Sequence, residues 1–187
     1  TDKGSNNLHV ILIFSEETDL SVLSGDFDAI MIRQKAKSAD SDDTIYWEFR
    51  DIVDFARSHD ALISIHAGHK TNGIDKEISN ALPVKEAIKA DIADAIHFFE
   101  IAQKRDIDEY EQYVFKDIAR RPLIMCSDNH NPKDYTVKEM LWIKADLTFA
   151  GLKQCLYQPQ ERVFIGNVPP ALERVSKNRQ SNISSIS

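Results

Sequence analysis

The chain has 187 residues, of which 42% are apolar, and its formal net charge at pH 7 is −7. This length and composition suit a globular domain with one sizeable hydrophobic core, and they exclude a disordered chain. No run of residues is long and apolar enough to span a membrane, and no segment has the layout of a signal peptide. The negative charge argues against broad electrostatic capture of nucleic acid by this segment alone.

Apolar runs and helical spacings alternate along the chain. Strands are expected where apolar residues run together, and helices where they recur every three or four residues. The strand-like runs are 8–14, 29–32, 61–66, 97–101, 123–126, 141–143 and 163–165. Helical spacing is found in 45–56, in 84–95 and in 148–156, where Thr148 is the expected N-cap. This alternation predicts an α/β fold with a mainly parallel sheet or barrel.

The segment after Gly166 has a different composition. It contains Pro169 and Pro170, and the polar run 176–182 follows them. Such a segment is typical of a linker, so residues 1–166 are expected to form the domain and residues 167–187 the linker. The cysteines Cys126 and Cys155 fall in a predicted strand and a predicted helix, so a disulfide framework is not indicated. A reducing, cytoplasmic location is therefore the default expectation.

Two metal-type ligands stand at the end of the apolar run 122–126. Asp128 and His130 are two residues apart, so on an extended strand both side chains project from the same face. A carboxylate oxygen and a neutral imidazole suit zinc, manganese or iron. The alternative is a strand that ends in a polar turn, with Asp128 as the cap of the next segment.

The run 60–66 has the same design, because it is an apolar strand that ends at His66 and is followed by His69 in a turn that contains Gly68. In parallel α/β folds the carboxyl ends of the strands gather on one face, where sites are built. His66, His69, Asp128 and His130 could therefore converge. The alternative for a single strand-end histidine is a hydrogen-bonded core residue.

These segments resemble the later metal-ligand motifs of the PHP (polymerase and histidinol phosphatase) superfamily. The resemblance is carried by the strand that ends at His66, the loop 67–73 and the segment 126–130. Further similarity is to the PHP region of TrlF-type proteins, in which a PHP domain precedes an AAA-like or SMC-like ATPase; it lies in 80–83, 89–93, 113–115, 141–154 and 161–166. The resemblance covers roughly residues 8–175.

The resemblance implies a distorted (β/α)7 barrel that binds two or three divalent metals, zinc, manganese or iron, and hydrolyses a phosphoester with metal-activated water. It implies that His66, Asp128 and His130 are metal ligands. Glu100 stands where such barrels often place an acidic strand-end residue, so it is a further candidate ligand. His69 and Lys70 are candidate contacts to the substrate phosphate, the alternative for Lys70 being a solvated loop cation. No residue is assigned as catalytic.

The chain departs from the family pattern, because the H-x-H strand with which PHP domains begin does not occur in it. We expect the domain to lack its first strands and the isolated chain to be weakly active or inactive. No phosphate-binding loop of the G-x-x-x-x-G-K-[ST] type is present, so the attached ATPase is expected outside this sequence. Two alternatives stay open: a non-catalytic scaffold that senses a ligand for the ATPase, and a metal-dependent nuclease that meets nucleic acid through the rest of the protein.

The remaining histidines and two aromatic residues are expected to be structural. His9 opens a strand, which places it at the floor or edge of a parallel barrel, away from the site. His59 is expected at a helix end and His97 at a strand start. Trp142 and Phe149 are expected to pack against the barrel.

Overall fold

The computed structural model of the chain describes residues 8–37, 47–70, 73–74, 94–116, 118–127, 129 and 131–177. Its strands form a four-stranded sheet in the order β1-β2-β3-β4 and a separate two-stranded sheet of β5 and β6. Neighbours β2, β3 and β4 are parallel, whereas β1 is antiparallel to β2. The four strands of the larger sheet are Val10–Ile13, Leu62–His66, Phe98–Glu100 and Leu123–Ile124.

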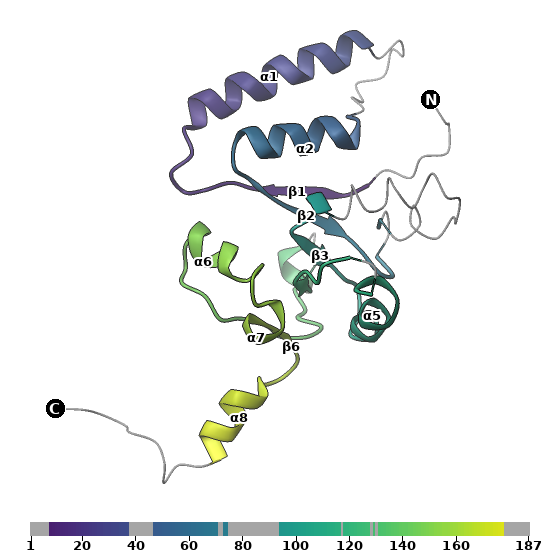
Figure 1. Ribbon diagram of the computed structural model, residues 1–187, viewed down its shortest axis with the longest axis vertical. Helices are drawn as coiled ribbons and strands as arrows, with labels where there is room; N and C mark the ends of the chain where they lie inside the picture. The colour runs from purple at the N-terminus through teal and green to yellow at the C-terminus, as the bar shows by residue number, and fades with distance from the viewer. Residues whose placement is uncertain are drawn as a thin grey trace, which may run out of the picture.

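Two helices stack on one face of the larger sheet. Figure 1 shows α2 (Phe49–Ser58) between the sheet and α1 (Leu20–Lys37). Helix α2 buries Val53 and Ala56 against Ile63 of β2 and against Ala61, the residue before this strand. Helix α1 is held to it by polar contacts made by its middle and its last turns: Asp26 with His59 at 3.3 Å, and Gln34 with Asp51. His59 lies at the C-cap of α2, as expected of a structural residue.

The expected strand 29–32 is wrong, because these residues lie inside α1. Four consecutive apolar residues fit a strand or one turn of a buried helix equally well, and only the neighbouring residues decide between them. None of the described helices, α1 included, is long and apolar enough to cross a membrane.

The opposite face of the larger sheet meets the C-terminal part of the chain. Leu62 and Phe98 pack there with Cys155, and Leu152 of α6 (Phe149–Gln154) lies against them. Thr148 caps α6 as expected, since its hydroxyl accepts a hydrogen bond from the Gly151 N–H at 3.0 Å. The side chains of His66 and Glu100 share this face, because strand residues two apart point the same way.

Helix α5 (Arg105–Glu109) continues directly into the π-helix η1 (Tyr110–Val114), where the Phe115 N–H donates to the Tyr110 carbonyl at 2.9 Å. Phe99 of β3 meets both ends of η1: its ring centroid lies 5.3 Å from that of Tyr110 and 6.3 Å from that of Phe115. Phe99 is fully buried and belongs to the largest core cluster, together with Ile65 and Ile101. This packing fixes α5 beside the carboxyl end of β3.

The remaining elements are short. They are the 3-10 helix η2 (Pro132–Asp134), the antiparallel strands β5 (Leu141–Ile143) and β6 (Val163–Ile165), and the helices α7 (Pro159–Arg162) and α8 (Pro170–Lys177). Helix α8 buries none of its side chains and extends away from the sheets in Figure 1. The segment expected as a linker thus contains a helix, and its role as a linker stays a prediction. The described strands form a mixed α/β fold, and the PHP-type barrel also stays a prediction.

Trp142 in β5 is half-buried, and its indole Nε1 donates a hydrogen bond to the Gly166 carbonyl at 3.0 Å. We expect Trp142→Phe to lower the free energy of unfolding by about 0.5–1.5 kcal/mol or more, because the hydrogen bond is lost and a smaller phenyl ring replaces the indole. Urea denaturation would measure the change. Tyr157→Phe is the matched control, since Tyr157 is 84% exposed and its loss of a hydroxyl should leave the midpoint unchanged. Equal midpoints for Trp142→Phe and wild type would contradict this role of the indole.

His97 precedes β3, and its Nδ1 accepts a hydrogen bond from the Ile63 N–H at 2.9 Å. Burial lowers the pKa of His97 below its ordinary value, and the positive charges of Arg121 and Lys153 lower it further. The folded protein therefore binds a proton at His97 less readily than the unfolded chain, whose histidines titrate near pH 6.5. The stability that depends on neutral His97 is complete above about pH 6.5 and is lost as the pH falls below that value.

This linkage predicts how a variant behaves. In His97→Asn the amide oxygen can replace Nδ1 as the acceptor for Ile63, but the side chain does not titrate. We expect the free energy of unfolding to fall less between pH 7.5 and pH 5 in the variant than in wild type. Chemical denaturation at each pH would show it. Two curves that run parallel over this range would contradict the proposed linkage.

Candidate metal centre

His66 and Glu100 lie side by side at the carboxyl ends of two neighbouring parallel strands. His66 is the last residue of β2 and Glu100 the last residue of β3, and their Cα atoms are paired in the sheet. Both residues are buried, with 8% and 3% of their surface exposed. His66 Nε2 lies 3.9 Å from Glu100 Oε2. Both residues stand at the ends of their strands, as expected from the sequence.

The chain turns tightly after β2 and brings Lys70 back to the same place. The Lys70 N–H donates to the Ala67 carbonyl at 3.2 Å, which closes a turn of residues 67–70. Lys70 is buried, and its ammonium group donates a hydrogen bond to Glu100 Oε1. Lys70 therefore neutralises Glu100 in the interior, where the sequence suggested a loop cation facing substrate or solvent.

His9 lies beside His66, although its position at the start of a strand predicted the floor or edge of the barrel. Because β1 is antiparallel to β2, its amino end lies at the carboxyl end of β2. The His66 N–H donates to the His9 carbonyl at 3.1 Å, and the two imidazole centroids are 4.7 Å apart. His9 thus lies on the edge strand, one of the two expected positions, but at the carboxyl end of β2 and not at the opposite end of the sheet, because β1 runs antiparallel.

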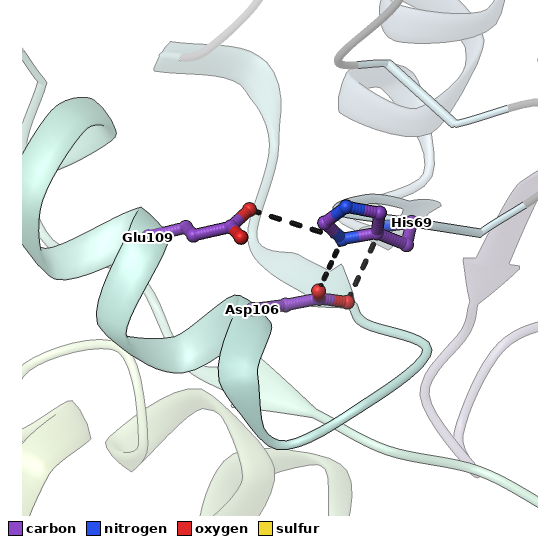
Figure 2. A group of neighbouring side chains, drawn as sticks. All are labelled: His69, Asp106 and Glu109. Atoms are coloured by element: carbon purple, nitrogen blue, oxygen red, sulfur yellow. Dashed lines mark hydrogen bonds and ion pairs between the residues drawn. The ribbon is translucent and has the colours of Figure 1, made fainter.

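A second group of side chains joins the turn after β2 to helix α5 (Figure 2). His69 Nδ1 lies 2.6 Å from Asp106 Oδ1 and 3.8 Å from Glu109 Oε2. Asp106 is fully buried, and its Oδ2 accepts hydrogen bonds from three backbone N–H groups, those of His69, Ala102 and Gln103. The side chain of His69 is 44% exposed, so this group lies at the surface of the molecule.

The hydrogen bonds keep Asp106 ionised. Burial acts to raise the pKa of Asp106, but the hydrogen bonds from the ring and the N–H of His69 and from the other two N–H groups lower it below its ordinary value. Gly68 allows the close approach on which these contacts depend. It has a left-handed φ of +60°, and a Cβ atom added to it would lie 2.5 Å from Asp106 Oδ2.

Asp128 and His130 lie outside the described residues, so their convergence with His66 stays a prediction. The strand before them is placed as expected, because β4 pairs in parallel with β3 and the Ile101 N–H donates to the Ile124 carbonyl at 2.9 Å. Asp106 and Glu109 were not predicted from the sequence. The available signal was an acidic residue in the first turn of a helix that directly follows a strand end.

The donor atoms of His66 and Glu100 fit a shared divalent cation. Metal bonds of about 2 Å allow two ligand atoms to lie up to roughly 4 Å apart. The observed separation of 3.9 Å is only just inside this limit, so the two donor atoms have to move closer together to reach the tetrahedral angle that zinc prefers. Both side chains are buried. The contact of Lys70 with Glu100 opposes this fit, because a cation bound to both Glu100 oxygens has to compete with the ammonium group.

The ligand atoms of His69, Asp106 and Glu109 also lie within 4.8 Å of one another, so this group could hold a metal by distance alone. Comparisons of the chain with models of protein families, with curated proteins and with solved structures found no match. A functional assignment therefore depends on the site itself and on the resemblance of its motifs.

Proposed function

We propose that this chain carries a metal-dependent phosphoester hydrolase centre of PHP type at the carboxyl ends of β2 and β3. The observation that supports it most is the buried pair of His66 and Glu100, which occupy paired positions on parallel strands with donor atoms 3.9 Å apart. The carboxyl ends of parallel strands are where α/β folds build their sites, and buried imidazole and carboxylate groups there are candidate site residues.

His66 and Glu100 would hold the metal, and Asp128 and His130 are the predicted further ligands. The ring of His9 lies beside that of His66. Bound zinc, manganese or iron would supply a water of lowered pKa as the nucleophile and positive charge for the phosphoryl oxygens. His69, exposed on the adjoining turn, is placed to contact a substrate that approaches this edge. The proposal includes a cytoplasmic location and an attached ATPase that uses this domain.

A second candidate function is a non-catalytic scaffold that senses a ligand for the attached ATPase. The ion pair of Lys70 with Glu100 favours it, because a carboxylate already neutralised by an ammonium group attracts a metal less strongly. A nuclease is a special case of the first function. With a net charge of −7, this chain would leave most of the contact with nucleic acid to the rest of the protein.

Metal binding tests the proposal directly. Calorimetric titration of the 187-residue chain with Zn²⁺ or Mn²⁺ should show metal binding. His66→Gln should weaken the affinity about 10-fold or more, since one of the metal ligands is lost. His59→Gln is the matched histidine control, because His59 contacts Asp26 on the other side of the sheet. Equal affinity of the His66 variant and wild type would contradict the centre.

Hydrolysis separates the two candidates. Turnover of a generic phosphomonoester or phosphodiester should be weak in this chain and should rise in a longer protein that includes an upstream H-x-H strand. Chelation should abolish the activity. Metal binding without any hydrolysis in the longer protein would favour the scaffold.

A further inference from the structure

We propose that Lys70 restricts Glu100 to a single ligand oxygen, and that the centre therefore selects zinc over manganese. This inference rests on the proposed function, since it concerns the metal of the same centre. It assigns a role to a buried lysine and chooses between metals that the types of the ligand residues leave open. Lys70 is a positioning residue, because its ammonium group would act on the metal only through Glu100.

The two oxygens of Glu100 face different partners. Oε1 accepts a hydrogen bond from the Lys70 ammonium group, whereas Oε2 lies 3.9 Å from His66 Nε2. A divalent cation held between His66 and Glu100 therefore meets Oε2, and it reaches Oε1 only by displacing the ammonium group. Glu100 and Lys70 are both buried, and breaking a buried ion pair costs far more than breaking an exposed one.

The turn that carries Lys70 is held in place by two backbone hydrogen bonds. The Lys70 N–H donates to the Ala67 carbonyl at 3.2 Å and closes the turn. The N–H of His69, the preceding residue, donates to Asp106 Oδ2 at 3.2 Å and ties the turn to helix α5. The backbone of Lys70 is thus fixed beside Glu100, and the position of its ammonium group on Oε1 does not depend on a free loop.

The number of oxygens that Glu100 offers affects zinc and manganese differently. Zinc sites in proteins are almost always tetrahedral with four ligands, whereas manganese suits octahedral sites that are rich in oxygen ligands. Zinc therefore loses little when Glu100 binds through Oε2 alone, but manganese loses a ligand oxygen. The charge of the Lys70 ammonium group repels both divalent ions alike, so it lowers both affinities and leaves their ratio unchanged. The ratio of the two affinities is the quantity that the restriction of Glu100 alters.

Titration with the two metals tests this selectivity. The dissociation constants of Zn²⁺ and Mn²⁺ are measured for the 187-residue chain and for Lys70→Met, which keeps an unbranched side chain and removes its charge. Zinc binds more tightly than manganese at most sites of this kind, so the change in the ratio between the two proteins is the readout. We expect Lys70→Met to reduce the preference for Zn²⁺ about 10-fold, as a residue that holds a metal ligand alters affinity to this extent.

Lys153→Met is the matched control. It removes the same charge from an ion pair with Asp60, which lies near the amino end of β2, whereas His66 is at the carboxyl end. The ratio of the Zn²⁺ and Mn²⁺ dissociation constants should be the same in Lys153→Met as in wild type. An equal change in both lysine variants would show that net charge, and not the contact with Glu100, sets the ratio, and would overturn the inference.

Nitrogen NMR of the wild-type chain gives a second measurement that needs no variant. The ammonium protons of Lys70 are buried in an ion pair and should exchange slowly with water, so we expect a Lys70 ¹⁵Nζ signal in the metal-free chain. The signal should persist when Zn²⁺ saturates the chain, because Oε1 stays with Lys70. Absence of the signal without metal, or its loss on Zn²⁺ binding, would overturn the inference.

The outcomes separate this inference from the proposed function. Zn²⁺ binding that depends on His66, with the same metal ratio in Lys70→Met as in wild type, would overturn the role of Lys70 and leave the centre standing. If Lys70→Met does not fold, the ammonium signal of the wild-type chain decides. Failure of wild type to bind either ion would count against the centre and against the inference together.

Discussion

Replacing Glu100 with Leu is expected to lower the free energy of unfolding by about 3–5 kcal/mol in the absence of metal. The reason is that Lys70 keeps its buried position on the turn after β2 but loses the carboxylate that neutralises its ammonium group. Removing one partner of a buried ion pair takes away a charge interaction that stabilises the other partner in a medium that solvates charge poorly. Equilibrium denaturation in urea at pH 7 would measure the loss.

The double variant Glu100→Leu, Lys70→Met is the control. It removes both charges and keeps similar volumes, so most of the lost stability should return. The two changes are then strongly non-additive, as expected for residues in contact. A loss below about 1 kcal/mol for Glu100→Leu alone would mean that the pair is solvated, since exposed ion pairs contribute no more than this.

Gly68→Ala is expected to cost about 2–4 kcal/mol of stability. A left-handed backbone costs a residue with a Cβ atom about 1–2 kcal/mol. The added methyl group would also lie 2.5 Å from Asp106 Oδ2 and would push the carboxylate away from buried N–H groups that then lack a partner. Thermal or urea denaturation would show the loss.

Gly25→Ala is the matched control for this change. Gly25 lies inside α1, and a Cβ atom added to it would have nothing within 4 Å. Alanine is a better helix former than glycine by about 0.5–1 kcal/mol, so this variant should be more stable than wild type. If the two alanine variants changed stability in the same direction, the turn at Gly68 would not have the geometry described.

Most strands and two helices could be predicted from the sequence, because their signals are local. The apolar runs that end at His66 and Ile124 form strands, and the spacing around Val53 predicts α2. The run 29–32 misled the prediction, since its apolar residues belong to a helix that packs on another helix. Helix α5 was missed because its five residues are too few for a helical period to show.

The candidate site was predictable where it follows a strand end and unpredictable where it depends on topology. His66 and Glu100 close their strands, so a parallel sheet brings them together. His9 reaches the same edge only because β1 is antiparallel to β2, and the residues of β1 do not indicate the direction of the strand. Asp106 depends on how a helix docks beyond β3, which is decided by packing of Phe99 rather than by a motif.

The π-helix η1 holds one residue more between two core aromatic side chains than a regular α-helix would. Tyr110 and Phe115 are five residues apart, which on a regular α-helix would turn their side chains roughly 140° away from each other. The wider π turn brings both to the ring of Phe99, and their own centroids to 5.7 Å from each other. Deleting one of residues 111–114 would leave the two aromatic residues four apart, which on a regular α-helix is a turn of only about 40°, so both rings would still face Phe99. The π turn of η1 therefore takes up one extra residue between β3 and β4 while both aromatic contacts are kept.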